Sequence, residues 1–108
     1  MSDTLKNLYL AVVNKKAAPM DSSYTSYLLQ RGEDKILTKI GEECTETILA
    51  VKNNSQADIV YEISDLLYHL TVLMVEKEIP PEAVLNELER RTVKINSCKA
   101  GEETLAGK

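Results

Sequence analysis

The sequence predicts an all-α fold, an antiparallel bundle of about four to five helices that a second copy of the chain completes. Apolar residues recur at helical spacing over several stretches, and turn signals separate these stretches. No segment shows the apolar–polar alternation bounded by turns that is typical of a strand. Helices this apolar, in a chain of only 108 residues, expose more hydrophobic surface than one copy covers. We therefore expect a homodimer.

Local signals predict where the first helices begin and end. A first helix is expected over residues 4–14, where leucines and valines lie on one face and Ser2 or Asp3 is available as a cap. Pro19 interrupts this pattern, and a loop is expected over residues 15–22. A short helix over residues 23–31 ends at Gly32, a residue type that favours helix C-termini.

Two long helices follow, over residues 33–52 and 56–77. The first begins with acids and ends with Lys52, which suits the helix dipole, and Ser55 caps the second. A turn this short implies an antiparallel pair. Pro81 lies in the first turn of a last helix that fades near Asn96. We expect one domain over residues 1–96 and a flexible tail over residues 97–108.

Composition excludes several classes of protein. With 44% apolar and 28% charged residues, the chain is globular rather than disordered. Its net charge of -4 argues against a nucleic-acid binder. It has no signal-peptide pattern and no membrane-spanning run, so we expect a cytoplasmic protein without a membrane partner. Cys44 and Cys98 have no CxxC spacing and are interpreted as reduced thiols.

Acidic residues border the apolar face of the helix over residues 33–52. At about 100° per residue, one sector gathers five charged residues, with Glu43 nearest the apolar boundary; the others are Lys35, Lys39, Glu42 and Glu46. Taken alone, this sector is explained equally well as a solvated flank in which Lys39 and Glu43 form an i,i+4 pair.

The next helix favours a functional interpretation. Between residues 59 and 75 the only full charges are Glu62 and Asp65, which share a sector with Asp58 and His69. Apolar residues flank this narrow stripe on both sides, whereas a solvated face is usually broader and contains lysines.

If the two acidic sectors face each other, four or five carboxylates converge without an arginine. Their repulsion raises their pKa values unless a cation binds. Hard divalent ions, Mg²⁺ or Mn²⁺, suit an all-carboxylate site. A single histidine and unpaired cysteines argue against zinc, and the Glu-x-x-His repeats of di-iron bundles and the EF-hand loop are absent from the sequence. The residues thus favour a metal-dependent enzyme acting on a phosphate ester or phosphoanhydride.

Motifs extend this interpretation to a family. E-E-x-x-E at residues 42–46 and E-x-x-D at residues 62–65 resemble the metal signature of all-α nucleoside triphosphate pyrophosphohydrolases. "SYTSYLLQRGEDKILTKIGEECTETILAVKN", "EISDLLYH" and the opening "LYLAVVNKKAAP" resemble the phosphoribosyl-ATP pyrophosphohydrolase family, over about residues 5–91. Cys44 stands where that family commonly has a small residue such as alanine, at a position expected to be packed.

The resemblance implies hydrolysis of the α–β phosphoanhydride of phosphoribosyl-ATP to phosphoribosyl-AMP and pyrophosphate, the second step of histidine biosynthesis. It implies Mg²⁺, with Mn²⁺ as an alternative, held directly by Glu43, Glu46, Glu62 and Asp65. Glu42 would bind a second ion or orient the attacking water. Carboxylates not occupied by metal would accept the proton of that water.

The resemblance also implies residues that bind the nucleotide. Lys39, together with Lys35 and Lys52, would neutralise the departing pyrophosphate, although each lysine is also explained as a surface charge. His69 would contact substrate or support a metal ligand, or would simply be a packed histidine with one hydrogen bond. Three residues before and at the start of the short helix would frame the adenine or ribose: Ser23, Tyr24 and Thr25. They are equally explained as a helix cap followed by a core tyrosine.

Two other functions fit the same residues. A house-cleaning pyrophosphohydrolase for dUTP, dCTP or damaged triphosphates would share the metal site and differ in its base pocket. A helical interaction module would use its acidic flanks to bind a basic partner and would not respond to Mg²⁺.

Overall fold

The computed structural model of the chain describes residues 3–97 and is all-α over that range. The predicted fold class is therefore confirmed. Its helices, in chain order, are α1 (Thr4–Ala17), α2 (Tyr24–Arg31), α3 (Glu33–Lys52), α4 (Gln56–Glu76) and α5 (Pro81–Ser97). The predicted tail over residues 97–108 lies outside the described residues except for its first residue, and so does Cys98.

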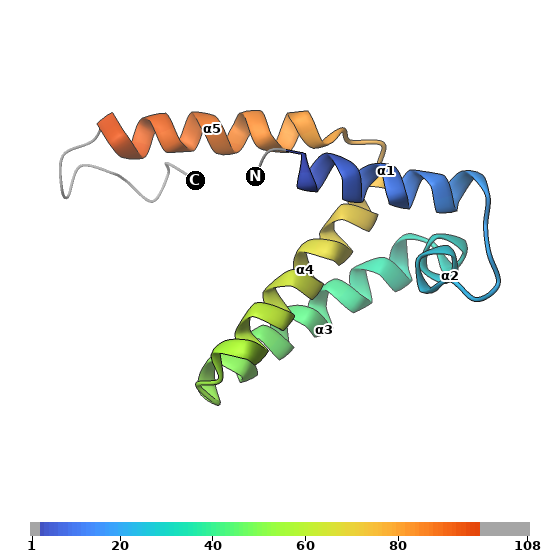
Figure 1. Ribbon diagram of the computed structural model, residues 1–108, viewed down its shortest axis with the longest axis horizontal. Coiled ribbons are helices and arrows are strands. Elements are labelled where there is room, and N and C mark those ends of the chain that lie inside the picture. Colours follow the sequence, from blue (N-terminus) through green and yellow to red (C-terminus); the bar gives the residue numbers. More distant parts are fainter. Residues whose placement is uncertain (1–2, 98–108) are drawn as a thin grey trace.

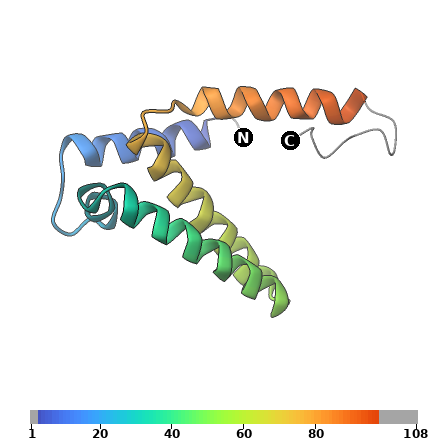
Figure 2. The same ribbon diagram turned by 180° about the vertical axis from the view of Figure 1, so that it is seen from behind.

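α3 and α4 form an antiparallel pair that makes the most extensive helix–helix contact in the described chain. Figure 1 shows this pair projecting away from α1 and α5, with the turn between α3 and α4 at its free end. α2 lies at the start of α3, beneath α1 at the right of this view. α5 runs in the opposite direction, toward the left of the view and away from α2. The view from behind in Figure 2 shows the same open arrangement.

The predicted caps are present at three helix ends. The side-chain oxygens of Ser23 and Ser55 accept hydrogen bonds from the backbone N–H groups of Ser26 and Asp58, at 3.1 and 3.3 Å. Gly32 ends α2 with φ +91° and ψ -169°, a backbone conformation that is open almost only to glycine. This glycine turns the chain from α2 directly into α3.

The end of α1 was predicted wrongly. The loop expected over residues 15–22 begins only at Ala18, because α1 continues through Lys15, Lys16 and Ala17. All three are good helix formers, and the two lysines complement the negative end of the helix dipole. The helix ends just before Pro19, which disfavours a helical conformation in the residue that precedes it.

The hydrophobic core lies where α1, α2, the beginning of α3 and the end of α4 meet. Its buried members are Val12, Leu28, Ile36, Val72 and Val75. Toward the α3–α4 turn the pattern changes, because Cys44, Ile48 and Val51 are exposed in the single chain. The expectation that Cys44 is packed is therefore wrong for one copy of the chain.

The single chain is extended for its size. Its radius of gyration is 16.2 Å and its principal extents are 52 × 34 × 25 Å, whereas a compact domain of 100 residues has a radius of gyration of about 13 Å. Within residues 3–97, no helix combines the length and the apolar character needed to cross a membrane.

Candidate active site

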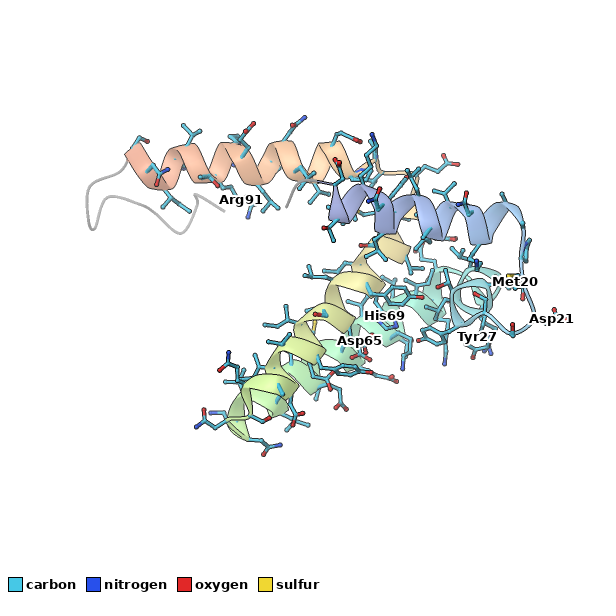
Figure 3. All side chains as sticks on the ribbon, in the orientation of Figure 1. Met20, Asp21, Tyr27, Asp65, His69 and Arg91 are labelled. Carbon is cyan, nitrogen blue, oxygen red and sulfur yellow. The ribbon has the colours of Figure 1, made fainter. Side chains whose placement is uncertain are left out.

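The acids of α3 and α4 meet just below the hydrophobic core. Glu43 is only 6% exposed although it carries a carboxyl group. A carboxylate oxygen of Glu43, one of Asp65 and a ring nitrogen of His69 all lie within 4.8 Å of one another. Figure 3 shows Asp65 and His69 close together on α4. The two acidic sectors therefore face each other at this point of the helix pair.

The surroundings of Glu43 oppose its ionisation. Burial, and then the neighbouring carboxylates of Asp65 and Glu62, raise the pKa of Glu43 from 4.5 to about 7. Repulsion between acids was expected to raise pKa values, and the direction is confirmed for this residue. Burial is the larger cause, because the core closes over the site from one side.

Of the remaining acids, Glu62 is close enough to Glu43 to raise its pKa. Glu46 and Glu62 line a cavity of about 190 Å³ on the side of the α3–α4 turn, together with Asp58 and Asn53. Glu42 is exposed to solvent, and its Oε1 accepts a hydrogen bond from Lys39 Nζ at 3.0 Å. The i,i+4 pair between Lys39 and Glu43 is therefore wrong, because Lys39 pairs at i,i+3 instead.

His69 is buried, at 2% exposure, and both of its ring nitrogens have partners. Nδ1 lies 2.8 Å from the backbone carbonyl oxygen of Asp65, which can only accept, so Nδ1 carries the proton. In the neutral ring Nε2 then accepts a hydrogen bond from the Tyr24 hydroxyl, at 2.9 Å. With both nitrogens occupied, His69 supports the site without offering a free ligand atom.

An aromatic group joins α2 to this part of α4. The rings of Tyr24 and Tyr68 each meet the His69 ring edge to face, at centroid distances of 5.7 and 4.9 Å. Thr25 and Tyr68 share a hydrogen bond between their hydroxyl groups. Tyr24 and Thr25 thus lie beside the acids, whereas the Ser23 side chain caps α2.

The three lysines of α3 have different surroundings. Lys39 is half-buried and close enough to Tyr24, Glu42 and Glu43 for their charges to act on it, and hydrogen bonding to Glu42 raises its pKa. Lys35 lies over the ring of Tyr27, 6.0 Å from its centroid. Lys52 is exposed at the end of α3, in the last turn before the α3–α4 turn.

Sequence reasoning missed Tyr68, Tyr27 and Arg31. The Y-H pair at residues 68–69 was used only as part of a motif, although it places a second aromatic ring beside the histidine. Tyr27 and Arg31 have i,i+4 spacing, a signal for side-chain contact on a helix. The partners of Tyr68 and Tyr24 lie 43 and 45 residues away, so helical periodicity gives no signal for these contacts.

The chemistry of the donor set suits a hard divalent cation. The available donors are carboxylate oxygens of Glu43, Glu62 and Asp65, since His69 is engaged elsewhere. Among the ion pairs of residues 3–97, no lysine or arginine pairs with these three acids. A buried, unpaired carboxyl group beside two others fits Mg²⁺ or Mn²⁺ better than zinc.

The chain is similar to proteins of one family over most of its length. A model of the family described as phosphoribosyl-ATP pyrophosphohydrolase matches residues 5–92. A phosphoribosyl-ATP pyrophosphatase of Bacillus mycoides is 50% identical over 96 residues, which are 89% of this chain and 90% of that protein. Its counterpart in Bacillus cytotoxicus is 47% identical over 103 residues, 95% of this chain and 96% of that protein.

A longer relative is similar to this chain over part of its own length. The histidine biosynthesis bifunctional protein HisIE of Caldanaerobacter subterraneus is 53% identical over 89 residues, which are 82% of this chain and 43% of that protein. This chain therefore spans less than half of the bifunctional relative and nearly all of the two from Bacillus. On the family match and these identities, the chain belongs to the phosphoribosyl-ATP pyrophosphohydrolase family.

Proposed function

We propose that the chain hydrolyses the α–β phosphoanhydride of phosphoribosyl-ATP to phosphoribosyl-AMP and pyrophosphate, in a magnesium-dependent reaction of histidine biosynthesis. Membership of the family and the names of the relatives support the substrate. The observation that carries the reaction type is the buried Glu43 facing Asp65 and Glu62 without a lysine or arginine partner in the described ion pairs.

Glu43, Glu62 and Asp65 would hold the ion, with Glu46 at the edge of the adjoining cavity as a further ligand. Bound there, Mg²⁺ would supply polarisation of the phosphoryl oxygens and a lowered pKa of coordinated water. The hydrophobic core closes one side of the acid cluster, which limits the access of bulk water from that side. The polyanionic substrate would then approach from the open side.

Residues around the acids have separate roles in this reaction. Lys39 would release Glu42 and neutralise charge on the departing pyrophosphate, leaving the Glu42 carboxylate free to orient or deprotonate the attacking water. The hydrogen bonds of His69 to the Asp65 carbonyl and to Tyr24 fix the position of the Tyr24 hydroxyl beside the acids.

The active unit is proposed to be a homodimer. Exposed apolar side chains continue along both helices of the projecting pair, and no other described element covers them: Leu37, Ile48, Leu49 and Val51 on α3, and Val60, Ile63 and Leu67 on α4. A second α3–α4 pair packed against the first would bury this surface and complete a four-helix bundle around the acids.

The experiment is a pyrophosphate-release assay with purified protein, phosphoribosyl-ATP and Mg²⁺. Release is expected from the native protein and is expected to fall to the background in excess EDTA and in Asp65→Asn and Glu46→Ala variants. A panel containing ATP, dUTP and dCTP tests the house-cleaning alternative. Faster turnover of any of these than of phosphoribosyl-ATP would replace the proposed substrate, and no Mg²⁺-dependent release from any nucleotide would refute the reaction.

A further inference from the structure

A cationic and aromatic cluster lies next to the candidate active site, and it is made of Tyr27, Arg31 and Lys35. The guanidinium carbon of Arg31 lies 5.5 Å from the centroid of the Tyr27 ring, and Lys35 Nζ lies 6.0 Å from the same centroid. Arg31 Nη1 also donates a hydrogen bond to the Tyr27 hydroxyl, at 3.1 Å. One tyrosine thus orders two cations at the junction of α2 and α3.

Within the described part of the chain, no acid pairs with the positive charge of this cluster. Arg31 and Lys35 take part in none of the ion pairs among residues 3–97. The nearby Glu33 is instead paired with Lys77, at 2.8 Å. Because a guanidinium carries five N–H donors and one is given to Tyr27, four remain for an anion. Arginine with a lysine beside it is a common combination for a phosphate group.

The cluster is connected to the acids through Tyr24. The Tyr27 and Tyr24 rings are stacked, with centroids 6.2 Å apart and an angle of 26° between their planes. Tyr24 is in turn 5.7 Å, ring to ring, from His69, which lies beside Asp65. Figure 3 shows Tyr27 on α2, separated from Asp65 and His69 on α4. Between Arg31 and the acids thus stand the rings of Tyr27 and Tyr24, so a group bound by Arg31 has a place of its own, apart from the phosphoanhydride held at the acids.

From this placement we infer that Tyr27, Arg31 and Lys35 bind a phosphate monoester carried by the substrate at the end remote from its triphosphate. The inference rests on the proposed function and deepens it, because phosphoribosyl-ATP has such a second phosphate on its ribosyl group and ordinary nucleoside triphosphates do not. The cluster selects nucleotides that carry a second phosphate group remote from the triphosphate, and it selects them over ATP. The acids and Lys39 act on the phosphoanhydride that both kinds of nucleotide contain.

Single Arg31→Gln and Lys35→Gln variants test the inference in steady-state kinetics. Each is expected to raise the KM for phosphoribosyl-ATP by roughly tenfold, the loss of one charge-assisted phosphate contact, with kcat changed by less than about twofold. Any turnover of ATP should be the same in these variants as in the native protein, since ATP lacks the remote phosphate. Arg31→Lys should retain most of the affinity. Lys6→Gln, at an exposed lysine of α1, is the matched control.

Three outcomes overturn the inference while leaving the proposed function intact. These are an unchanged KM in both glutamine variants, an equal loss with ATP and phosphoribosyl-ATP, and a loss confined to kcat. Circular dichroism of each variant identifies a loss of fold. If a glutamine variant is unfolded, Arg31→Lys or Lys35→Arg is compared with the native protein instead, because both keep the charge and alter the geometry.

A binding measurement separates this inference from the reaction itself. Calorimetric titration with phosphoribosyl-AMP and with AMP needs no turnover. The native protein is expected to bind phosphoribosyl-AMP about tenfold more tightly, and Arg31→Gln is expected to abolish the difference. If the native protein hydrolyses nothing, the proposed function fails, and equal affinities for the two nucleotides would then refute the phosphate subsite as well.

Discussion

Glu43 is a carboxylic acid that the fold keeps partly protonated near neutral pH. Because its pKa is raised from 4.5 to about 7, the folded chain retains a proton between these values that the unfolded chain has released. For this group, stability is therefore greatest below about pH 4.5 and is lost as the pH rises through about 7. A metal bound at the site would reverse the preference, since it favours the ionised carboxylate.

We expect metal-free protein in EDTA to lose stability between pH 5 and pH 8, and the Glu43→Gln variant to lose less over the same range, because glutamine does not titrate. Urea denaturation at each pH measures the difference. Mg²⁺ should raise the midpoint of the native protein at pH 8 and leave that of the variant nearly unchanged. Parallel pH profiles for the two proteins would contradict this role of Glu43.

Tyr24 supplies the hydrogen-bond donor of a buried histidine. Tyr24→Phe leaves His69 Nε2 without its partner in a site that is 2% exposed, and a buried unsatisfied group of this kind costs about 1–3 kcal/mol. Tyr27→Phe removes a hydroxyl whose one hydrogen bond among residues 3–97 comes from the exposed Arg31, so the loss of stability should be at most about 0.5 kcal/mol. Urea denaturation of both variants makes the comparison, and equal losses would show that Tyr24 does not satisfy His69.

At the scale of the elements, two glycines at and inside α3 should respond oppositely to alanine. Gly32 has φ +91°, where an alanine side chain is strained although nothing lies within 4 Å of its added Cβ, so Gly32→Ala should cost about 1–3 kcal/mol. Gly41 lies inside the helix with the same open space, and Gly41→Ala should stabilise the chain by about 0.5–1 kcal/mol. Free energies of unfolding from urea titrations measure both, and a stabilising Gly32→Ala would contradict the strain.

The helices themselves were largely predictable, for local reasons. α3 begins and ends at the predicted residues, because Gly32 before it and the 53–55 turn after it are strong chain signals. The end of α1 was missed because Pro19 acts mainly on its own neighbour, so residues 15–17 remain free to stay helical. The sequence placed Glu43 nearest the apolar boundary of α3 without deciding between burial and a solvated flank, and the structure shows it buried. The contact between Tyr24 and His69 depends on how α2 packs on α4 and has no local signal.

At the scale of the whole molecule, the exposed apolar face of α3 and α4 marks the limit of sequence reasoning. Periodicity predicts that a helix face is buried and does not say whether the same chain or another copy covers it. Ile48 and Val51 follow the apolar pattern of α3 and are nevertheless 60% and 52% exposed. The same ambiguity made Cys44 look packed, although it is exposed in the single chain.

We expect the native protein to sediment with the mass of two chains, and an Ile63→Glu, Leu67→Glu double variant to sediment as one chain, because each glutamate places a charge on the apolar face. Pyrophosphate release should be lost together with the dimer. Thr92→Glu, at an exposed polar position of α5, is the control for added charge. A native protein that sediments as one chain at micromolar concentration and is still active would refute the dimer.

The pairing of two consecutive helices also bears on how the protein is made. Glu43 and Asp65 belong to adjacent helices joined by a turn of three residues, so only a short loop has to close before the acids meet. Contacts of such short sequence separation form early in folding. During translation, the carboxylates can therefore gather as soon as α4 has left the ribosome, because α5 contributes none of these acids. A nascent chain of this kind already concentrates negative charge at one point of a helical hairpin.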